Sequence, residues 1–174
     1  MTLFLPTAAV GKVTDITPEL IRSMGASAIL LDVDSTLAPH GSQTPFSGTV
    51  EWSHRMQDTG IKIIIMSNNF KKRVKPFAEK FNLPFISCSL KPFPSTYFRA
   101  ISRLGVKRSD AVVVGDQIFT DILGANLARI KSILLVPRGE EDSLSYSVRR
   151  ALEKPIRAKI AEPGREKNSY RGRS

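Results

Sequence analysis

Two carboxylates one residue apart, Asp32 and Asp34, directly follow the apolar run at residues 29–31. Such a run is typical of a buried strand in a parallel sheet, and ligands of open α/β sheets bind beyond the carboxyl ends of these strands. The pair alone specifies little, because closely spaced acids also occur as turn and helix-capping residues. Its interpretation depends on which other side chains reach the same edge.

Side chains suited to one polar site also occur at three later points of the chain. They are Ser67, Asn68 and Asn69 after the apolar run 61–66, Lys91 before a predicted helix that begins at Pro94, and Asp116 and Asp121 after the apolar run 111–115. A hydroxyl followed by backbone N–H groups can hold an anionic oxygen, and a lysine can supply positive charge. Taken singly, each has an ordinary explanation as a helix cap, a solvated lysine or a first-turn acid. The ordered set favours a single site.

The acids of this set have no histidine or cysteine partners at metal-binding spacing. Such a group of oxygen ligands suits Mg²⁺ better than zinc or copper, and phosphate is the natural substrate group for that metal. Phosphate monoesters hydrolyse so slowly in water that enzymes accelerate the reaction by up to ~10²¹-fold. A nucleophile, a metal, a cation and an acid must therefore act together, and the set offers residues for all four roles.

The elements that must position these residues alternate between strands and helices. Strands are predicted near residues 29–31, 61–66, 84–86, 111–115 and 132–136, and helices near 18–24, 47–59, 70–81, 94–104, 118–129 and 143–153. This alternation predicts a Rossmann-like, three-layer α/β sandwich around a central parallel sheet. The first helix has the clearest start, because Thr17 is a good N-cap residue and Pro18 suits the first helical position.

Composition predicts one domain followed by a basic tail. The chain has 174 residues, 41% of them hydrophobic, and a formal net charge of +10. We expect a single domain at 1–154 and a disordered tail at 155–174, because the end of the chain has little apolar content to offset the entropy of ordering. Residues 147–174 hold nine Lys and Arg against three Glu, so the tail could contact anionic lipid or nucleic acid, or simply aid solubility.

The remaining sequence signals concern the compartment and the isolated polar residues. A single cysteine, Cys88, excludes an internal disulfide and fits a reducing compartment, so a cytoplasmic location is expected. No apolar run approaches the ~20 residues of a membrane-spanning helix, and the apolar start of the chain is a poor signal peptide that we expect to pack on the domain. His40 and His54 are predicted to be ordinary surface or loop residues, Trp52 a packing residue and Cys88 structural.

These motifs resemble those of the haloacid dehalogenase (HAD) superfamily of phosphohydrolases. The matching pieces are Asp32-Val33-Asp34-Ser35-Thr36, Ser67, Lys91 and Gly115-Asp116 with Asp121, and the resemblance covers about residues 14–137. More narrowly, residues 15–18, 67–69, 91–92 and 115–121 are similar to the small capless (class III), YqeG-like branch, which includes phosphatidylglycerophosphate phosphatases. The usual pattern of that branch has Asn at the position of Ser35.

The resemblance implies a role for each site residue. Asp32 would be the nucleophile that forms an aspartyl-phosphate, and Asp34 the acid/base residue. Mg²⁺ would be bound by Asp32, the backbone carbonyl of Asp34 and Asp116, with Asp121 as a further ligand or water-orienting group. The implied partners of the transferring phosphoryl group are Ser67 and the N–H of Asn68, which would bind its oxygens, and Lys91, which would neutralise its charge.

The spacing of the motifs leaves no room for a cap domain, since only 30 residues separate Thr36 from Ser67 and 21 separate Asn69 from Lys91. An open site can accept a phosphate carried on something large, and the basic residues at 71–75 would either attract an anionic surface or form a solvated face. The favoured prediction is a phosphatidylglycerophosphate phosphatase, peripheral at the inner face of the membrane. The alternatives are a HAD phosphatase for a soluble or protein phosphomonoester, and a nucleic-acid- or ribosome-associated binding protein on this fold.

Overall fold

The apolar runs predicted to be strands pair in parallel in the computed structural model, which describes residues 3–138 and 144–161. Within these residues one sheet has the strand order β1-β6-β5-β2-β3-β4. Its strands are β1 (Ala8–Val10), β2 (Ala28–Leu31), β3 (Lys62–Met66), β4 (Phe85–Ile86), β5 (Ala111–Gly115) and β6 (Lys131–Leu135). The predicted three-layer α/β sandwich with a parallel sheet is confirmed.

The central strand β2 sets the position of the site. All four of its residues are buried, and Leu31 lies opposite Ile65 of β3 and Val114 of β5. The segments that follow these three strands therefore leave the sheet at the same edge. This register brings together the polar residues that follow each apolar run.

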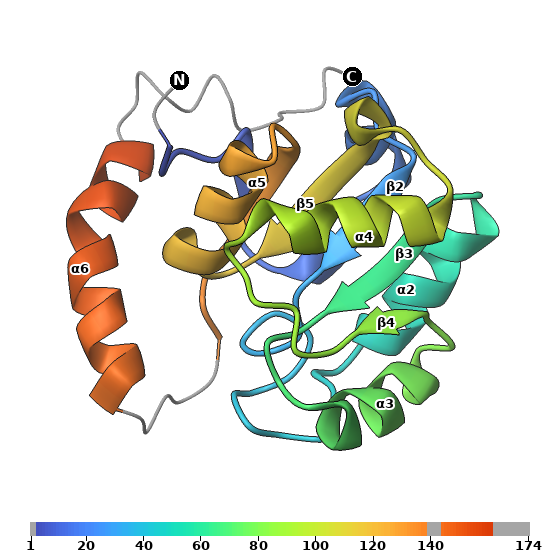
Figure 1. The fold of residues 1–174 in the computed structure, drawn as a ribbon, viewed down its shortest axis with the longest axis horizontal. Coiled ribbons are helices and arrows are strands. Elements are labelled where there is room, and N and C mark those ends of the chain that lie inside the picture. Colours follow the sequence, from blue (N-terminus) through green and yellow to red (C-terminus); the bar gives the residue numbers. More distant parts are fainter. Residues whose placement is uncertain (1–2, 139–143, 162–174) are drawn as a thin grey trace.

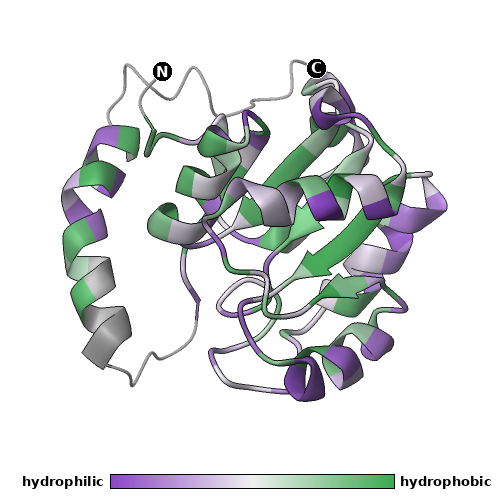
Figure 2. Ribbon diagram, in the orientation of Figure 1, coloured by the Kyte–Doolittle hydropathy of each residue, from purple (hydrophilic) through white to green (hydrophobic). Residues whose placement is uncertain are grey.

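Helices cover both faces of the sheet (Figure 1). On one face lie α1 (Pro18–Ser23), α2 (Thr49–Asp58) and α3 (Lys71–Lys80), and on the other α4 (Pro94–Leu104) and α5 (Leu123–Leu127). Side chains alternate along the strands, so Leu31 packs with the first group and Leu30 with the second. Figure 2 shows the hydrophobic strands enclosed by helices with more hydrophilic outer surfaces.

Short helical segments and α6 complete the described fold. They are the 3₁₀ turns at Val13–Asp15 and Arg108–Asp110, a π-helical segment at Ile118–Ile122, and α6 (Leu144–Ala161). Ile156 and Ile160 of α6 pack against a small cluster of Ile118, Ile122 and Leu134. None of the helices in the described ranges combines the length and apolar composition needed to cross a membrane.

Several elements differ from the sequence predictions at their ends. The helix predicted at 118–129 begins as a π-helical segment and ends at Leu127, and β1 was not predicted because three residues carry no measurable periodicity. The helix predicted to end at 153 continues through Pro155 to Ala161, because its apolar residues keep packing on the domain. The first residues of the predicted tail are therefore helical, and residues 162–174 lie outside the described ranges, so the domain boundary stays a prediction.

The structure also shows the surroundings of Trp52 and Cys88, for which the sequence predicts packing and structural roles. Trp52 is 2% exposed, and its indole N–H donates to the carbonyl oxygen of Ile16 at 2.8 Å, so its packing role is confirmed. Cys88 was predicted to be structural, but it is exposed in the loop after β4. Its backbone adopts a left-handed conformation with φ 46°, and its N–H donates to the carbonyl of Asn69 at 2.8 Å.

Candidate active site

Three buried carboxylates meet at the carboxyl edge of the sheet. Asp32 follows β2, Asp116 follows β5, and Asp121 lies in the π-helical segment that comes next. Each offers one oxygen to a group whose atoms all lie within 4.8 Å of one another. Because Asp116 and Asp121 have no exposed surface and Asp32 is 6% exposed, their mutual repulsion is weakly screened by water.

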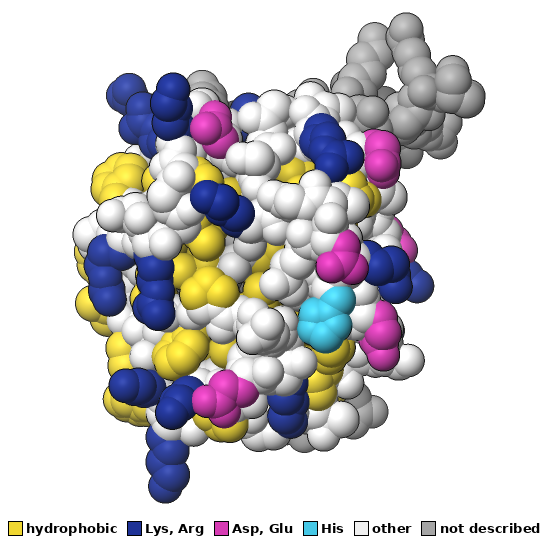
Figure 3. Space-filling view, turned by 90° about the vertical axis from the view of Figure 1, so that its right-hand side faces the viewer, with side chains coloured by type: hydrophobic (Ala, Val, Ile, Leu, Met, Phe, Trp, Pro, Cys, Tyr) yellow, Lys and Arg dark blue, Asp and Glu magenta, His cyan; other side chains and the backbone are white. Residues whose placement is uncertain are grey.

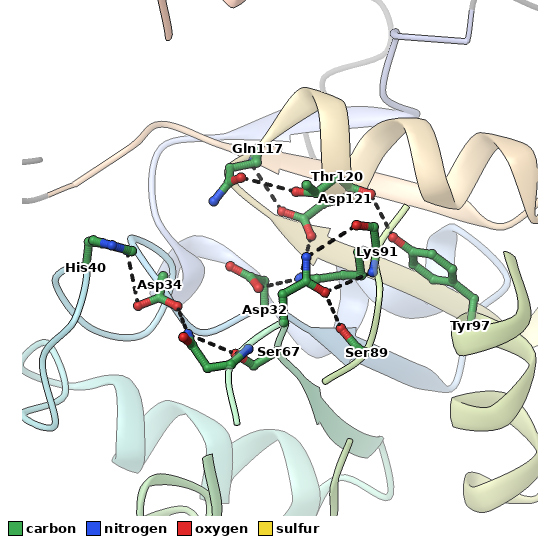
Figure 4. Close-up of polar contacts among 12 residues, drawn as sticks. Asp32, Asp34, His40, Ser67, Ser89, Lys91, Tyr97, Gln117, Thr120 and Asp121 are labelled. Carbon is green, nitrogen blue, oxygen red and sulfur yellow. Dashed lines mark hydrogen bonds and ion pairs between the residues drawn. The ribbon is translucent and has the colours of Figure 1, made fainter. Parts of the chain in front are cut away.

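Lys91 joins this acidic cluster from the loop between β4 and α4 (Figure 4). Its ammonium contacts Oδ1 of Asp32 and, at 2.7 Å, Oδ1 of Asp121. Burial alone would lower the pKa of Lys91, but the Asp121 and Asp32 carboxylates outweigh it and raise that pKa well above its usual range. Lys91 therefore stays charged in a site where a lone buried lysine would tend to lose its proton.

Burial has the opposite consequence for Asp32. It raises the pKa of this carboxyl well above the ordinary value, and Asp121 and Asp116 raise it further, although Lys91 opposes them. A charged Asp32 is thus unfavourable in this environment. The repulsion among these buried carboxylates is unfavourable, and a bound cation would relieve it.

Asn68 places Lys91 through its side chain. Its Oδ1 accepts the N–H of Lys91 at 2.8 Å and the hydroxyl of Ser89 at 2.7 Å, while its Nδ2 donates to the carbonyl of Lys91 at 3.3 Å. The N–H of Ser89 also donates to the carbonyl of Ser67 at 3.0 Å. The loop after β3 and the loop after β4 are therefore held together beside the acidic cluster.

Ser67, predicted to bind phosphoryl oxygens, is 2% exposed at the end of β3. Its hydroxyl oxygen accepts the backbone N–H of Asn69 at 3.2 Å and the side-chain amide of Asn69 at 3.3 Å. Ser67 and Asn68 thus lie in the loop that holds Lys91, beside Asp32. Their predicted contacts to phosphate remain predictions.

Asp121 occupies space that only a glycine at position 115 leaves open. A Cβ on Gly115 would lie 2.3 Å from Oδ2 of Asp121, far below van der Waals contact. The same Oδ2 accepts the N–H of Gln117 at 3.2 Å. The glycine before Asp116 therefore has a physical role, since it allows this carboxylate to lie directly against β5.

Asp34 points away from the other acids. Its carboxylate accepts hydrogen bonds from Arg73 at 2.6 Å, from the side-chain amide of Asn69 at 2.8 Å and from the N–H of Gly41 at 3.1 Å. Nδ1 of His40 lies 3.5 Å away. The two carboxylates of the opening pair thus have separate surroundings, one facing Lys91 and the acidic cluster, the other facing Arg73 and His40.

These contacts correct two sequence interpretations. His40, taken as an ordinary loop residue, lies beside Asp34 because the chain from 38 to 41 turns back over the strand end. Arg73, part of the basic run for which a solvated face was the alternative, reaches Asp34 from the first turn of α3. Only its spacing, one helical turn after Asn69, could have indicated this contact.

The donor set fits a divalent cation. Three buried carboxylates supply hard oxygen ligands, and Oδ2 of Asp32 is buried with no hydrogen-bond partner among the described residues. Lys91 contacts two of these acids but balances a single negative charge. Asp32, Asp116 and Asp121 are therefore the side chains that could hold a metal.

Comparisons with known proteins agree with this geometry. A protein-family model described as haloacid dehalogenase-like hydrolase matches residues 18–129. The Bacillus subtilis (strain 168) protein named "Probable phosphatase YqeG" is 35% identical over 161 residues, covering 92% of this chain and 94% of the relative.

The chain belongs to the HAD-like hydrolases. Within them it belongs to the capless, YqeG-like branch, and in the described residues the loops after β2, β3 and β4 lead directly into α2, α3 and α4. A crystal structure of an uncharacterized protein from Listeria monocytogenes serotype 4b shares the fold, with a TM-score of 0.55 and 19% identity, covering 68% of this chain and 84% of that one. The activity supported for this HAD protein is that of a phosphatase.

Ser35 can be explained within this branch. Its backbone φ is 58°, a left-handed conformation that Asn adopts more readily than most other residues with a side chain. The Asn usual at this position suits that backbone. Ser35 keeps the loop geometry through its N–H, which donates to the carbonyl of Ala38 at 2.7 Å.

Proposed function

We propose that this protein is a Mg²⁺-dependent phosphomonoesterase that works through an aspartyl-phosphate on Asp32, with phosphatidylglycerophosphate as its substrate at the cytoplasmic face of the membrane. The observation that carries the chemistry is the contact of one buried lysine, Lys91, with both Asp32 and Asp121. A carboxylate held between a cation and an acidic cluster is suited to attack phosphorus when the cluster's charge is balanced.

In the first step an oxygen of Asp32 forms a bond to phosphorus, and the bond from phosphorus to the substrate alkoxide breaks. Asp34 donates a proton to that alkoxide, so the alcohol leaves neutral. In the second step Asp34 accepts a proton from water, whose oxygen attacks phosphorus and displaces the Asp32 carboxylate. Inorganic phosphate is released, and both side chains return to their starting states.

Lys91 and the acidic cluster have distinct tasks in this proposal. Lys91 neutralises charge shared between Asp32 and the transferring phosphoryl group, while Ser67 and the N–H of Asn68 bind its oxygens. Asp32, Asp116, Asp121 and the backbone carbonyl of Asp34 would hold Mg²⁺, which supplies charge neutralisation to the phosphoryl oxygens when bound. Arg73, Asn69 and His40 orient Asp34.

The rim of the site supports a substrate carried by a membrane. Phe70 is 78% exposed, Leu90 67% and Phe93 65%, and these residues flank the Ser67 loop and Lys91. Lys71 and Lys72 are exposed beside Phe70. Apolar side chains next to lysines suit the interface of an anionic bilayer, where each basic residue contributes about 1 kcal/mol.

The wider surface has the same mixed character. Figure 3 shows hydrophobic and basic side chains intermixed on the right-hand side of the molecule as seen in Figure 1, a face other than the carboxyl edge of the sheet. An open site with such a rim could meet a phosphate at the headgroup level without drawing the lipid out of the membrane.

A phosphate-release assay with Mg²⁺ tests the proposal. Phosphatidylglycerophosphate in mixed micelles is compared with soluble phosphomonoesters, a phosphopeptide and a 5′-phosphorylated oligonucleotide, with Asp32→Asn as the control for contaminating enzymes. We expect the lipid to be hydrolysed with the highest kcat/KM. Rapid turnover of a soluble compound without lipid hydrolysis would contradict the substrate but keep the chemistry.

A soluble phosphomonoester is the second candidate, and one comparison favours it. The "Glyceraldehyde 3-phosphate phosphatase" of Methanopyrus kandleri is 35% identical over 71 residues, which cover 36% of this chain and 30% of that protein. Nucleic-acid binding without phosphatase activity would instead favour the binding-protein alternative. RNA binding measured alongside the assay, with and without residues 162–174, identifies that outcome.

A further inference from the structure

Helix α6 makes polar contacts with the segment that carries two of the three clustered acids. This helix lies outside the sheet and its covering helices (Figure 1). Its apolar residues Ile156 and Ile160 already attach it to the domain. Two charged residues one turn apart on α6, Glu153 and Arg157, nevertheless point toward the backbone around Asp116.

Glu153 contacts the start of the π-helical segment that contains Asp121. Its side chain has no exposed surface, and Oε1 accepts the N–H of Ile118 at 2.8 Å. A fully buried carboxylate is costly unless it is paired and hydrogen-bonded. Arg157 provides the pairing, because its guanidinium contacts Oε2 at 2.8 and 3.0 Å.

Arg157 also reaches the residue that carries another of the acids. The guanidinium NH2 group donates to the backbone carbonyl of Asp116, and the NH1 group lies 3.4 Å from the carbonyl of Leu135 at the end of β6. The two α6 side chains therefore hold the backbone at Asp116 and at Ile118, on both sides of Gln117. The Gln117 N–H in turn donates to Asp121.

We propose that Glu153 and Arg157 are positioning residues that fix the Asp116 to Asp121 segment, so that α6 sets how tightly the acidic cluster binds a divalent cation. The inference rests on the proposed Mg²⁺ site. Three carboxylates that repel one another will separate unless their backbone is held, and these contacts hold it at Asp116 and Ile118. Partners that orient the ligands of a metal typically change its affinity by 10- to 100-fold when removed.

The test measures Mg²⁺ binding by isothermal titration calorimetry without substrate, using the full chain. Arg157→Met removes the contacts to Glu153 and Asp116 while keeping much of the side chain, and Arg157→Lys keeps a positive charge with fewer donors. We expect the Kd to rise by about 10-fold or more in Arg157→Met and by less in Arg157→Lys. Glu153→Gln, which can still accept the N–H of Ile118, should show a loss smaller than that of Glu153→Ala.

Ile160→Ala is the matched control on the same helix. It removes apolar packing against Ile118, Ile122 and Leu134 without touching the polar contacts, so it should lower Tm and leave the Kd for Mg²⁺ unchanged. Equal Kd values in wild type and Arg157→Met would overturn the inference, as would an equal loss of affinity in Ile160→Ala. Wild-type protein that binds no Mg²⁺ would refute the metal site itself, a result distinct from equal Kd values in wild type and Arg157→Met. Folding of each variant is followed by the fluorescence of Trp52, which is buried near Ile16.

Discussion

Individual residues of the site are arranged for chemistry at a cost to folding. Asp32 and Lys91 are buried among further acids, and Asp121 occupies space that a side chain at Gly115 would fill. The sequence was sufficient to predict that Asp32, Ser67 and Asp116 lie at one edge of the sheet, because each directly follows a buried strand. It could not predict that Asp34 would face Arg73 and His40, since those contacts depend on how the loop at 38–41 folds back.

Asp32→Asn should make the protein more stable while abolishing turnover. Because burial raises the folded-state pKa of Asp32 above that of the unfolded chain, the native state binds more protons between the two values, and stability falls as pH rises through that interval. The neutral amide avoids this loss. In chelator at pH 7 we expect a gain of about 1 kcal/mol, which is a rise in Tm of ~2–4 °C, by calorimetry.

Activity of the same variant should fall by at least about 10³-fold in a Mg²⁺-dependent phosphatase assay, because the nucleophile is lost. Mg²⁺ should raise the Tm of the wild type more than that of Asp32→Asn, since it binds the charged carboxylate. A wild type that is the more stable protein in chelator at pH 7 would show that Lys91 fully compensates the burial of Asp32.

Gly115→Ala should disrupt the site through Asp121. The new Cβ would lie 2.3 Å from Oδ2 of Asp121, so that side chain must move away from Lys91 and the other acids. A displacement of about 1 Å can reduce a rate by about 10²-fold, and we expect a loss of kcat of that order. Gly60→Ala is the control, because its Cβ would meet nothing within 4 Å and its φ of +85° costs stability alone. Equal activity of the two variants would contradict this role of Gly115.

At the scale of elements, long buried strands and well-capped helices were predictable, whereas short or interrupted ones were not. β2 and β5 are continuous apolar runs, and Thr17 caps α1 by accepting the N–H of Leu20 at 3.2 Å. The helix predicted near 143–153 instead continues through Pro155 to Ala161. The four-residue spacing of Ile156 and Ile160 was the signal that the helix continues.

Helix α3 links the basic run to the chemistry through Arg73. Arg73→Met should lower kcat on a soluble phosphomonoester by roughly 10- to 100-fold, because Asp34 loses its 2.6 Å contact and its fixed orientation. Lys75→Met, whose side chain is 57% exposed and pairs with Glu79, should keep wild-type kcat. Steady-state kinetics of both variants separates a role of Arg73 in orienting Asp34 from a general effect of positive charge. Equal kcat values for Arg73→Met and the wild type would refute the role in orientation.

The whole molecule presents its site without a cap, and the structure explains why the motif spacing predicts this. The described loops after β2, β3 and β4 lead into α2, α3 and α4, so these loops hold no inserted cap domain. The rim residues Phe70 and Phe93 could not be found from the sequence, since a phenylalanine at a helix start is as readily buried as exposed. Their exposure is set by the path of the two loops joined by Asn68.

Phe70→Ser combined with Phe93→Ser should weaken binding to vesicles that contain phosphatidylglycerol by at least about 10-fold, since the side chains no longer enter the interface. Turnover of a soluble phosphomonoester should change by less than about 2-fold, because neither side chain contacts the acidic cluster. Co-sedimentation measures the first effect and phosphate release the second. Leu127→Ser, at an exposed position of α5, is the control for a general loss of apolar surface and should keep vesicle binding. Unchanged vesicle binding in the double variant would exclude the rim as the membrane contact.

The side chain of Asn68 constrains which substitutions the loops after β3 and β4 can accept. One amide joins the loop that presents Ser67 to the loop that presents Lys91, through bonds to backbone atoms on the far side. A substitution at 68 therefore alters two loops at once and can be accommodated only if residues 88–91 change with it. Among relatives, positions 67–69 and 88–91 should vary as a single unit, inherited together even though some 20 residues of helix and strand separate them.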